Sequence, residues 1–324
     1  MQTVQGISHG LRVETAGQST AGGGLRRVGL RLGLVLALVV LTGCGSLQSS
    51  KQQEPSPPAA ERREVRLGLA LGGGAARGFA HVGVIQVLEE AGLRPSHVVG
   101  TSAGSLVAAL YASGKTPAEL VRVAESMQEA EITDWMLPIL NRGALRGEAL
   151  AKYVNTQVGG KTMEQMQIPL GIVATDLGSG QAITFRRGNT GAAVRASSAV
   201  PAVFQPVRLG DREYVDGGLV WPVPVRQTRE MGANFVIAVD ISSDPEGNPY
   251  GDTFQILMQT FAIMGKSINT LALKEADLVI RPALSGIKSA DFSARLRSIE
   301  AGRVAMRAAL PALKVRLAQF EEGR

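Results

Sequence analysis

From residue 65 onward, short runs of apolar residues alternate with longer stretches in which apolar residues recur at helical spacing. Apolar runs without intervening polar residues are typical of strands that are buried on both faces of a sheet. Parallel neighbours in such a sheet must be joined by a crossover, which is usually a helix. The alternation therefore predicts an α/β fold with a mainly parallel central sheet.

The individual elements follow from the same pattern. We expect strands at 65–71, 98–99, 170–174, 212–215, 235–239 and 278–280, and helices at 78–91, 103–112, 116–127 and, as one helix or two, 293–320. The helix at 116–127 begins with Thr116-Pro117, a good N-cap followed by a good first helical residue. We find neither an internal repeat nor a second linker, and therefore expect one domain, from 64 to 320.

A different kind of sequence precedes this domain. Arginines at 26, 27 and 31 lead into an apolar run at 32–41, which ends in Leu41-Thr42-Gly43-Cys44. A basic start, an apolar stretch of about ten residues and small residues at its end are typical of a secretory signal. The ending resembles the lipobox of bacterial lipoproteins, in which the cysteine is lipidated and becomes the mature amino terminus. The alternative is a short buried apolar helix with a chance cysteine.

We therefore expect a signal peptide at 1–43 and a lipid anchor at Cys44 that holds the protein to a membrane of the bacterial cell envelope, on its periplasmic side. Residues 44–63 hold almost no large apolar side chains and three prolines. This composition predicts a solvated tether, which as a flexible coil would span roughly 25 Å.

The charge balance bears on the partner. The net charge of +6 suggests nucleic acid or an acidic membrane surface. Without residues 1–43, however, 30 basic and 27 acidic side chains remain, a net charge of +3. Aromatic residues make up 4% of the chain, too few for a base-stacking platform. We therefore expect no nucleic-acid partner, and with one Cys and three His, neither a disulfide nor a structural zinc site.

The first of three glycine-containing turns directly follows the strand expected at 65–71. It reads Gly72-Gly73-Gly74-Ala75-Ala76-Arg77-Gly78 and opens a helix. Such a turn presents backbone N–H groups at a positive helix end, which is what an anion needs. A dinucleotide site would also want an acidic residue about twenty positions later. Since 97–100 offers none, nucleotide binding is not favoured, and a purely structural glycine turn remains the alternative.

The second turn, Gly100-Thr101-Ser102-Ala103-Gly104, again lies between a strand and a helix. It matches the G-x-S-x-G nucleophile elbow, in which a serine occupies the tip of a sharp strand-to-helix turn. The flanking glycines allow the close backbone approach that a side chain would block. Ser102 at a helix N-terminus would also have its developing negative charge stabilised. We therefore expect Ser102 to be a nucleophile.

The third turn, Asp216-Gly217-Gly218, supplies the candidate base. A lone Asp-Gly is usually only a turn. The histidines do not serve better: His9 is lost with the signal peptide, and His97 starts the strand that ends at Ser102, roughly 16 Å away. His81 lies within the helix after the first turn, where we expect a packed or capping residue. The sequence thus favours a Ser102–Asp216 dyad.

These three turns, in this order, resemble the patatin-like phospholipase family, and most closely its bacterial branch related to neuropathy-target-esterase catalytic domains. Further matching stretches lie at 79–84, 174–177, 194–201, 204–207 and 222–225, so that the resemblance covers about 65–240. It implies a three-layer αβα fold and a lipid acyl hydrolase with Ser102 as nucleophile, Asp216 as base and an oxyanion turn. The oxyanion donors would come from Gly73, Gly74 and Ala75, with supporting roles for Arg77, Gly78, Gly100, Gly104, Gly217 and Gly218.

The implied reaction is hydrolysis of carboxylic esters of phospholipids or lysophospholipids through an acyl-enzyme. It needs neither a cofactor nor a metal, and the sequence shows no calcium-type acidic cluster. Arg77 would position the oxyanion turn or a substrate phosphate, or simply form an ion pair at a helix start. A thioesterase or general carboxylesterase would use the same residues. A catalytically idle, membrane-tethered interaction protein is the alternative from another class.

One apolar segment, 252–273, has no place in these motifs. It is rich in Ile, Leu, Met and Phe, and its interruption by Gly265, Lys266 and Ser267 argues against a membrane span. We expect a helix of the protein core there, with a helix that faces lipid or the acyl channel as the second interpretation.

Overall fold

The structure is a computed structural model that describes residues 62–134, 142–248, 250–288 and 290–323. The signal peptide predicted at 1–43, the lipid anchor predicted at Cys44 and all but the last two residues of the predicted tether lie outside these ranges.

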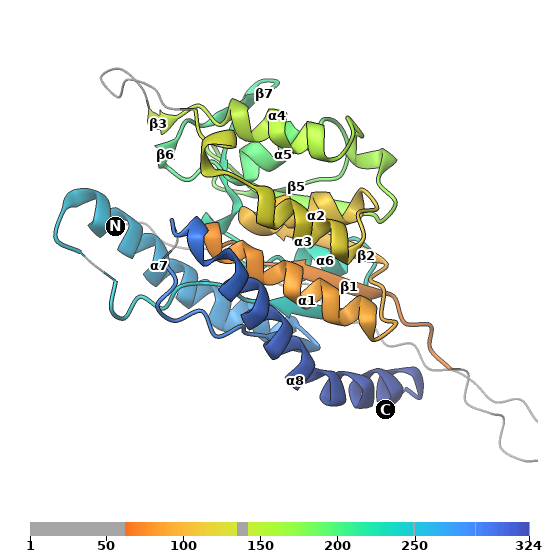
Figure 1. The fold of residues 1–324 in the computed structure, drawn as a ribbon. Helices are drawn as coiled ribbons and strands as arrows, with labels where there is room; N and C mark the ends of the chain where they lie inside the picture. The colour runs from red at the N-terminus through yellow and green to blue at the C-terminus, as the bar shows by residue number, and fades with distance from the viewer. Residues whose placement is uncertain (1–61, 135–141, 249, 289, 324) are drawn as a thin grey trace, which may run out of the picture. The chain divides into compact units, whose positions relative to one another are not determined.

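The centre of the domain is an eight-stranded sheet (Figure 1). Its order is β10-β9-β1-β2-β4-β8-β7, with β5 paired to the other edge of β4. The parallel strands are β1 (Leu67–Leu71), β2 (His97–Thr101), β4 (Leu170–Asp176), β9 (Phe235–Val239) and β10 (Leu278–Ile280). The antiparallel strands are β5 (Ala182–Phe185), β7 (Val207–Leu209) and β8 (Arg212–Asp216). The expected α/β class with a mainly parallel sheet is therefore confirmed.

The middle strand, β1, shows why the sheet forms. Every residue of its Leu-Gly-Leu-Ala-Leu sequence is buried, between β2 and β9. Its three leucines belong to the main apolar core, whereas Ala70 belongs to a second core on the other face. Because side chains alternate across a strand, β1 contributes to both cores at once. The sheet therefore has helices on both of its faces.

The helices divide between these faces. α1 (Phe79–Glu90), α2 (Ala103–Ala112), α3 (Pro117–Ser126) and α8 (Arg295–Glu321) contribute to the main core, and α6 (Val225–Glu230) to the second. α4 (Glu148–Gln157) and α5 (Thr190–Ser197) pack on each other beside β4, next to the small β3 (Gly143–Leu145) and β6 (Ala202–Phe204) pair. The predicted N-cap of α3 is present as a capping box between Thr116 and Glu119.

One expectation about the elements is wrong. The segment 252–273 does form a helix, α7 (Thr253–Ala272), but it is not a core helix, because only Asn269 and Ala272 are buried. α7 contacts the turns at Gly217–Leu219 and Leu273–Glu275, and its amino-terminal end extends outward from the rest of the domain (Figure 1). Apolar composition predicts the helix but does not say which of its faces a neighbour covers.

The pairing along β4 brings two strand ends together. β2 follows one edge of β4 as far as Thr101, opposite Val173, and β8 continues along that edge with Asp216 opposite Ala174. Since β5 occupies the other edge, β2 and β8 share the same side of β4. The residue after β2 is Ser102 and the last residue of β8 is Asp216, so the register places these two residues next to each other.

Candidate active site

Ser102 lies at the turn between β2 and α2, at the N-cap of the helix. Its backbone has φ 53° and ψ −124°, a conformation that residues with a side chain rarely adopt. Such strain persists only where the surrounding structure enforces it, and it is common at catalytic residues. The local geometry is therefore that of the nucleophile elbow that the sequence predicts.

The flanking glycines allow this turn. A Cβ at Gly100 would lie 2.3 Å from the carbonyl oxygen of Gly104, and a Cβ at Gly104 would lie 2.1 Å from the carbonyl oxygen of Leu71. Both distances are far below van der Waals contact. The elbow thus packs backbone against backbone on β1, and a side chain at either glycine would force Ser102 out of place.

A second serine holds the elbow from a distant part of the chain. The Ser102 N–H donates to Oγ of Ser197, at 2.8 Å, and the Ser197 hydroxyl donates to the Val173 carbonyl, at 2.5 Å. Ser197 is completely buried. It therefore links the strained backbone of Ser102 to β4, which also pairs with Asp216.

Asp216 is fixed as firmly as Ser102. Its N–H donates to the Ala199 carbonyl at 3.0 Å, and its own carbonyl accepts from the Thr175 hydroxyl at 2.8 Å. One carboxylate oxygen, Oδ1, accepts the Gly218 N–H at 2.6 Å. The other, Oδ2, is buried without a hydrogen-bond partner among the described residues. A buried acceptor with free capacity is suited to receive a proton.

Burial raises the pKa of Asp216 to about 6, and the Ser102 hydroxyl and the Gly218 N–H oppose that rise. The Ser102 hydroxyl is thus near enough to act on the carboxylate, although it forms no hydrogen bond of ordinary geometry with Oδ2. Hydrogen bonds between catalytic groups are often long before substrate binds. A carboxyl group with a pKa of about 6 is ionised at neutral pH and still basic enough to take a proton.

The glycine-rich turn lies against Ser102, since a Cβ at Gly73 would come within 3.1 Å of the Ser102 Cβ. The Gly73 N–H, however, donates to the Pro222 carbonyl at 2.9 Å and is not free to bind an oxyanion. The N–H groups of Gly74 and Ala75 have no acceptor among the described residues. Of the three residues expected to donate to an oxyanion, Gly74 and Ala75 therefore remain as candidates.

Two buried basic side chains support this turn. Arg77 donates from Nε to the Gly74 carbonyl at 3.4 Å, and His81 donates from Nε2 to the Gly72 carbonyl at 2.8 Å. Burial lowers the pKa of His81 to about 4, so the ring is neutral at pH 7. Burial also lowers the pKa of Arg77, and the charge of Asp240 opposes this. Both side chains contact the turn rather than Ser102, which agrees with the packed role expected for His81.

His97, the second histidine in the described part of the chain, lies far from the site. His97 is the first residue of β2 and contacts Ser96, whereas Ser102 follows the last residue of that strand. Asp176, in one of the stretches that carried the resemblance, forms an ion pair with Arg212 at 2.7 Å. Of His81, His97, Asp176 and Asp216, Asp216 is therefore the acid or base candidate that the fold brings to Ser102.

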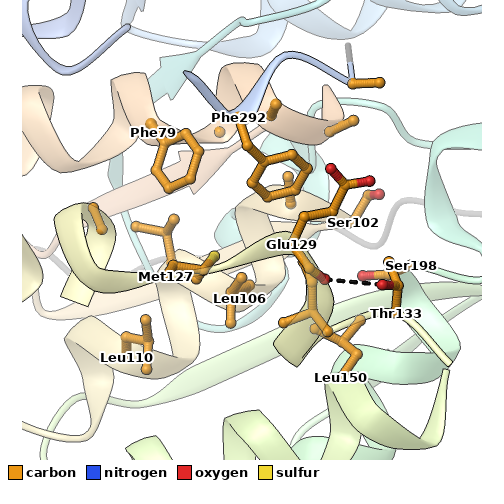
Figure 2. Close-up of a pocket in the computed structure, with 18 of the residues that line it drawn as sticks. Phe79, Ser102, Leu106, Leu110, Met127, Glu129, Thr133, Leu150, Ser198 and Phe292 are labelled. Atoms are coloured by element: carbon orange, nitrogen blue, oxygen red, sulfur yellow. Dashed lines mark hydrogen bonds between the residues drawn. The ribbon is translucent and has the colours of Figure 1, made fainter. Parts of the chain in front are cut away.

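An apolar cavity of about 250 Å³ opens beside Ser102 (Figure 2). Phe79 and Phe292 contact each other edge to face in its wall, with ring centroids 5.8 Å apart. The lining is almost entirely apolar, and Figure 2 shows Leu106, Leu110 and Met127 along it. Its polar members are Ser102, Glu129, Thr133 and Ser198. The cavity suits an apolar chain whose reactive end lies at Ser102.

The structure therefore brings together most of the residues that the sequence predicts. Ser102, Asp216 and the turns around them converge, including Arg77, Gly78, Gly100, Gly104, Gly217 and Gly218. Cys44 lies outside the described residues. Sequence reasoning missed Ser197 and Glu129. Ser197 lies in a stretch, 194–201, that carried the family resemblance, but nothing local indicates which atoms it binds.

Comparison with known proteins gives an independent assignment. Residues 69–229 match the family described as patatin-like phospholipase. This range contains the glycine-rich turn, Ser102 and Asp216.

The relatives lead to the same family. An uncharacterised NTE family protein of Mycobacterium tuberculosis is 37% identical over 197 residues, which are 60% of this chain and 54% of that protein. Another from the same species is 30% identical over 273 residues, 76% of this chain and 46% of that protein. Patatin-like phospholipase domain-containing protein 6 of Mus musculus is 31% identical over 58% of this chain and 14% of that protein. This chain thus spans about half the length of its mycobacterial relatives.

Among solved structures, VipD from Legionella pneumophila superposes with a TM-score of 0.55 at 15% sequence identity, covering 78% of this chain and 68% of that one. At this identity the likeness shows the fold alone.

Proposed function

Because residues 69–229 place this chain in the patatin-like phospholipase family, we propose that it is a serine acyl hydrolase that cleaves carboxylic esters of phospholipids or lysophospholipids. The family and its relatives support a lipid acyl hydrolase. The observation that carries the finer proposal is the strained Ser102, which lies beside the buried Asp216 at an apolar cavity.

The first step is attack of the Ser102 hydroxyl on the ester carbonyl. Oδ2 of Asp216 accepts the hydroxyl proton as the new C–O bond forms. The carbonyl oxygen then becomes an oxyanion, which the N–H groups of Gly74 and Ala75 stabilise. Loss of one such donor typically costs about 10²–10³ in kcat. Arg77 and His81 hold the carbonyls of the same turn and so keep these N–H groups in place.

The second step releases the acyl group. Asp216 returns its proton to the departing alcohol, which leaves an acyl ester on Ser102. Water, deprotonated by the same carboxylate, then attacks the acyl carbonyl. The bond to Ser102 Oγ breaks, the fatty acid leaves, and Asp216 returns the proton to Ser102. The acyl chain occupies the cavity between α1, α2 and α3, where its apolar surface is removed from water.

The dyad can be tested with a soluble short-chain ester and a fluorophosphonate probe. We expect Ser102→Ala to lose labelling and at least about 10³-fold in kcat, and Asp216→Asn to lose at least about 10². Ser113→Ala is the matched control, since Ser113 is a buried serine at the far end of α2. Full turnover in either folded dyad variant would refute the assignment.

The same probe separates the competing functions. Failure to label Ser102 in folded protein would favour a catalytically idle interaction protein. Labelling together with thioester cleavage, but without release of fatty acid from phospholipid, would favour a thioesterase.

We also propose that Cys44 anchors the protein to a membrane of the cell envelope after removal of residues 1–43. This proposal rests on the sequence 41–44 and on the apolar run before it. Mass spectrometry of the amino-terminal peptide from membranes tests it. A diacylglyceryl group on Cys44 is the expected result, and an unmodified peptide that still contains residues before Cys44 would overturn it.

A further inference from the structure

The outward side of α7 carries several large apolar side chains, together with Thr260, Ser267 and Thr270, which are also exposed. Ile256, Ile263, Met264 and Leu271 are between 48% and 68% exposed. Ile256, Ile263, Met264 and Leu271 follow one another at intervals of seven, one and seven positions, and so share one side of the helix. Lys266 is the single charged residue between Thr253 and Ala272. Large apolar patches of this kind mark interaction surfaces.

The opposite side of α7 is attached next to the catalytic residues. Asn269 donates to the Ser242 hydroxyl at 2.8 Å, and Lys266 pairs with Asp244 at 3.1 Å. A Cβ at Gly265 would lie 3.8 Å from Pro222, an ordinary contact. The helix also contacts the turn Gly217–Leu219, which directly follows Asp216. The apolar side therefore has a fixed orientation beside the active site.

By length and hydropathy alone, the segment Thr253–Glu275 could cross a bilayer. The contacts of Lys266 and Asn269 favour another arrangement, because a spanning helix would have to lose both. A helix that is attached along one side and exposes large apolar side chains, interspersed with hydroxyl groups, on the other is suited to lie in the plane of a membrane surface.

We propose that α7 docks the domain on a lipid bilayer, with Ile256, Ile263 and Leu271 in the interface and the active site beside it. This inference rests on the proposed function, since the bilayer would be both the docking surface and the source of substrate. An enzyme that lies on the bilayer can take up a lipid chain without exposing it fully to water.

The chain before the domain is long enough to allow this contact. Arg62, the first described residue, is 18 positions after Cys44, and an extended chain of this length spans about 60 Å. A domain of this size has a radius of gyration of about 18 Å, and hence a diameter of just under about 50 Å. A lipid anchor at Cys44 therefore leaves the domain free to turn α7 toward the membrane that holds the anchor.

The test uses the fact that Cys44 is the only cysteine of the chain. In full-length protein with Cys44→Ser, an environment-sensitive fluorophore is attached at Ile263→Cys or, as control, at Val304→Cys. Val304 is also an exposed apolar residue, 57% against 51%, but it lies on α8. Vesicles of phosphatidylethanolamine and phosphatidylglycerol are added, with and without a nitroxide quencher on the acyl chains.

We expect a blue shift and quenching at position 263 and neither at position 304. Equal responses at the two positions, or none at 263, would overturn the proposal. A shift at 263 that appears without vesicles and grows with protein concentration would instead assign the surface to a second copy of the chain.

A second measurement ties docking to turnover. The variant Ile256→Ser, Ile263→Ser, Leu271→Ser should lose about tenfold or more of its hydrolysis of vesicle lipid, because less apolar surface enters the bilayer. Its kcat/KM for the soluble ester should stay within about twofold of wild type. The matched control is Leu296→Ser, Val304→Ser, Val315→Ser, which removes equally exposed residues from α8. Equal losses in both triple variants would contradict docking through α7.

The two proposals can fail separately. Fluorophore insertion does not need catalysis and is repeated with Ser102→Ala. Insertion without any ester hydrolysis by wild-type protein would leave docking intact and refute the hydrolase. Hydrolysis of the soluble ester without insertion of the fluorophore would support the hydrolase and refute docking through α7.

Discussion

Asp216 must carry a charge to accept a proton, yet it is only 6% exposed. One of its carboxylate oxygens is held by the Gly218 N–H, and the other has no partner among the described residues. Desolvation without full compensation raises its pKa to about 6. The same burial that makes Asp216 a useful base therefore makes its charge unfavourable for the folded state.

This balance predicts the pH dependence of the reaction. Turnover of the soluble ester should fall about tenfold per pH unit below about pH 6, as Asp216 becomes protonated. His97 serves as the control, because it starts β2 at the opposite end of the strand from Ser102. Burial lowers its pKa. His97→Gln should leave the pH profile of turnover unchanged. A rate that is unchanged between about pH 7 and about pH 5 would contradict the role of Asp216.

The stability of the domain should change with pH in the opposite direction to turnover. Between the ordinary value of 3.8 and about 6, the folded protein binds more protons at Asp216 than the unfolded chain does. The contribution of this group to the free energy of unfolding therefore decreases as pH rises through that window. Thermal melts across this pH window should show the contribution in wild type and its absence in Asp216→Asn.

Ser197 is expected to position the nucleophile. Ser197→Ala removes the acceptor of the Ser102 N–H and the donor to Val173, so kcat should fall roughly 10–100-fold with little change in KM. Ser298→Ala is the matched control, because Ser298 is also fully buried but its hydroxyl has no partner among the described residues. A rise in KM with unchanged kcat would show that Ser197 does not act through Ser102.

At this scale the sequence predicts those residues whose pattern is local. Ser102 and Asp216 each lie in a short motif between recognisable elements. Ser197 binds Ser102, 95 positions earlier in the chain, and Val173, 24 positions earlier. The Gly73 N–H similarly donates to Pro222 from the other half of the domain. Contacts of this kind depend on the finished fold, and no spacing in the sequence indicates them.

At the scale of elements, α1 and α8 pack in close contact. A Cβ at Gly302 would lie 2.0 Å from the carbonyl oxygen of Ala80, and a Cβ at Gly83 would lie 2.0 Å from that of Ile299. The two backbones thus touch at a pair of glycines. This contact attaches the carboxyl-terminal helix to the helix that opens from the oxyanion turn.

Two substitutions of the same kind should have opposite effects on stability. Gly302→Ala forces α1 and α8 apart and should cost about 1–3 kcal/mol. Gly265→Ala, in the interior of α7, meets nothing closer than 3.8 Å and should stabilise the domain by about 0.5–1 kcal/mol. Urea unfolding of both variants tests the pair. Stabilisation by Gly302→Ala would show that the helices do not cross at these residues.

The elements themselves were largely predictable. The strand at Phe235–Val239 and the helix at Ala103–Ala112 have the bounds that their apolar runs predict. The helices α4, α5 and α6 and the short strands β3, β5, β6 and β7 are absent from the expected elements. In β5 and β6 the few residues are half-buried or exposed and carry no clear period. The core position expected for α7 was wrong for a different reason. Its composition is that of a buried helix, and only the tertiary contacts of Asn269 and Ala272 reveal which side is covered.

For the whole molecule, the buried apolar clusters define the extent of the folded unit. Their first member is Leu67 and their last is Leu317, and the backbone of Arg63 is bonded to that of Glu321. If Cys44 is lipidated as proposed, the residues before this unit would hold it at a membrane, and α7 would set its orientation there.

Limited proteolysis tests this division. Lys51, Arg62 and Arg63 are the tryptic sites in the predicted tether, and Arg62 and Arg63 are exposed. Trypsin should therefore first produce a fragment that begins between residues 52 and 64 and still labels at Ser102. The main apolar core and the second core lie wholly within that fragment, so its unfolding midpoint should match that of the full chain. Loss of labelling on release of the tether would mean that the preceding residues belong to the active fold, and the anchor would then be part of the enzyme rather than an attachment to it.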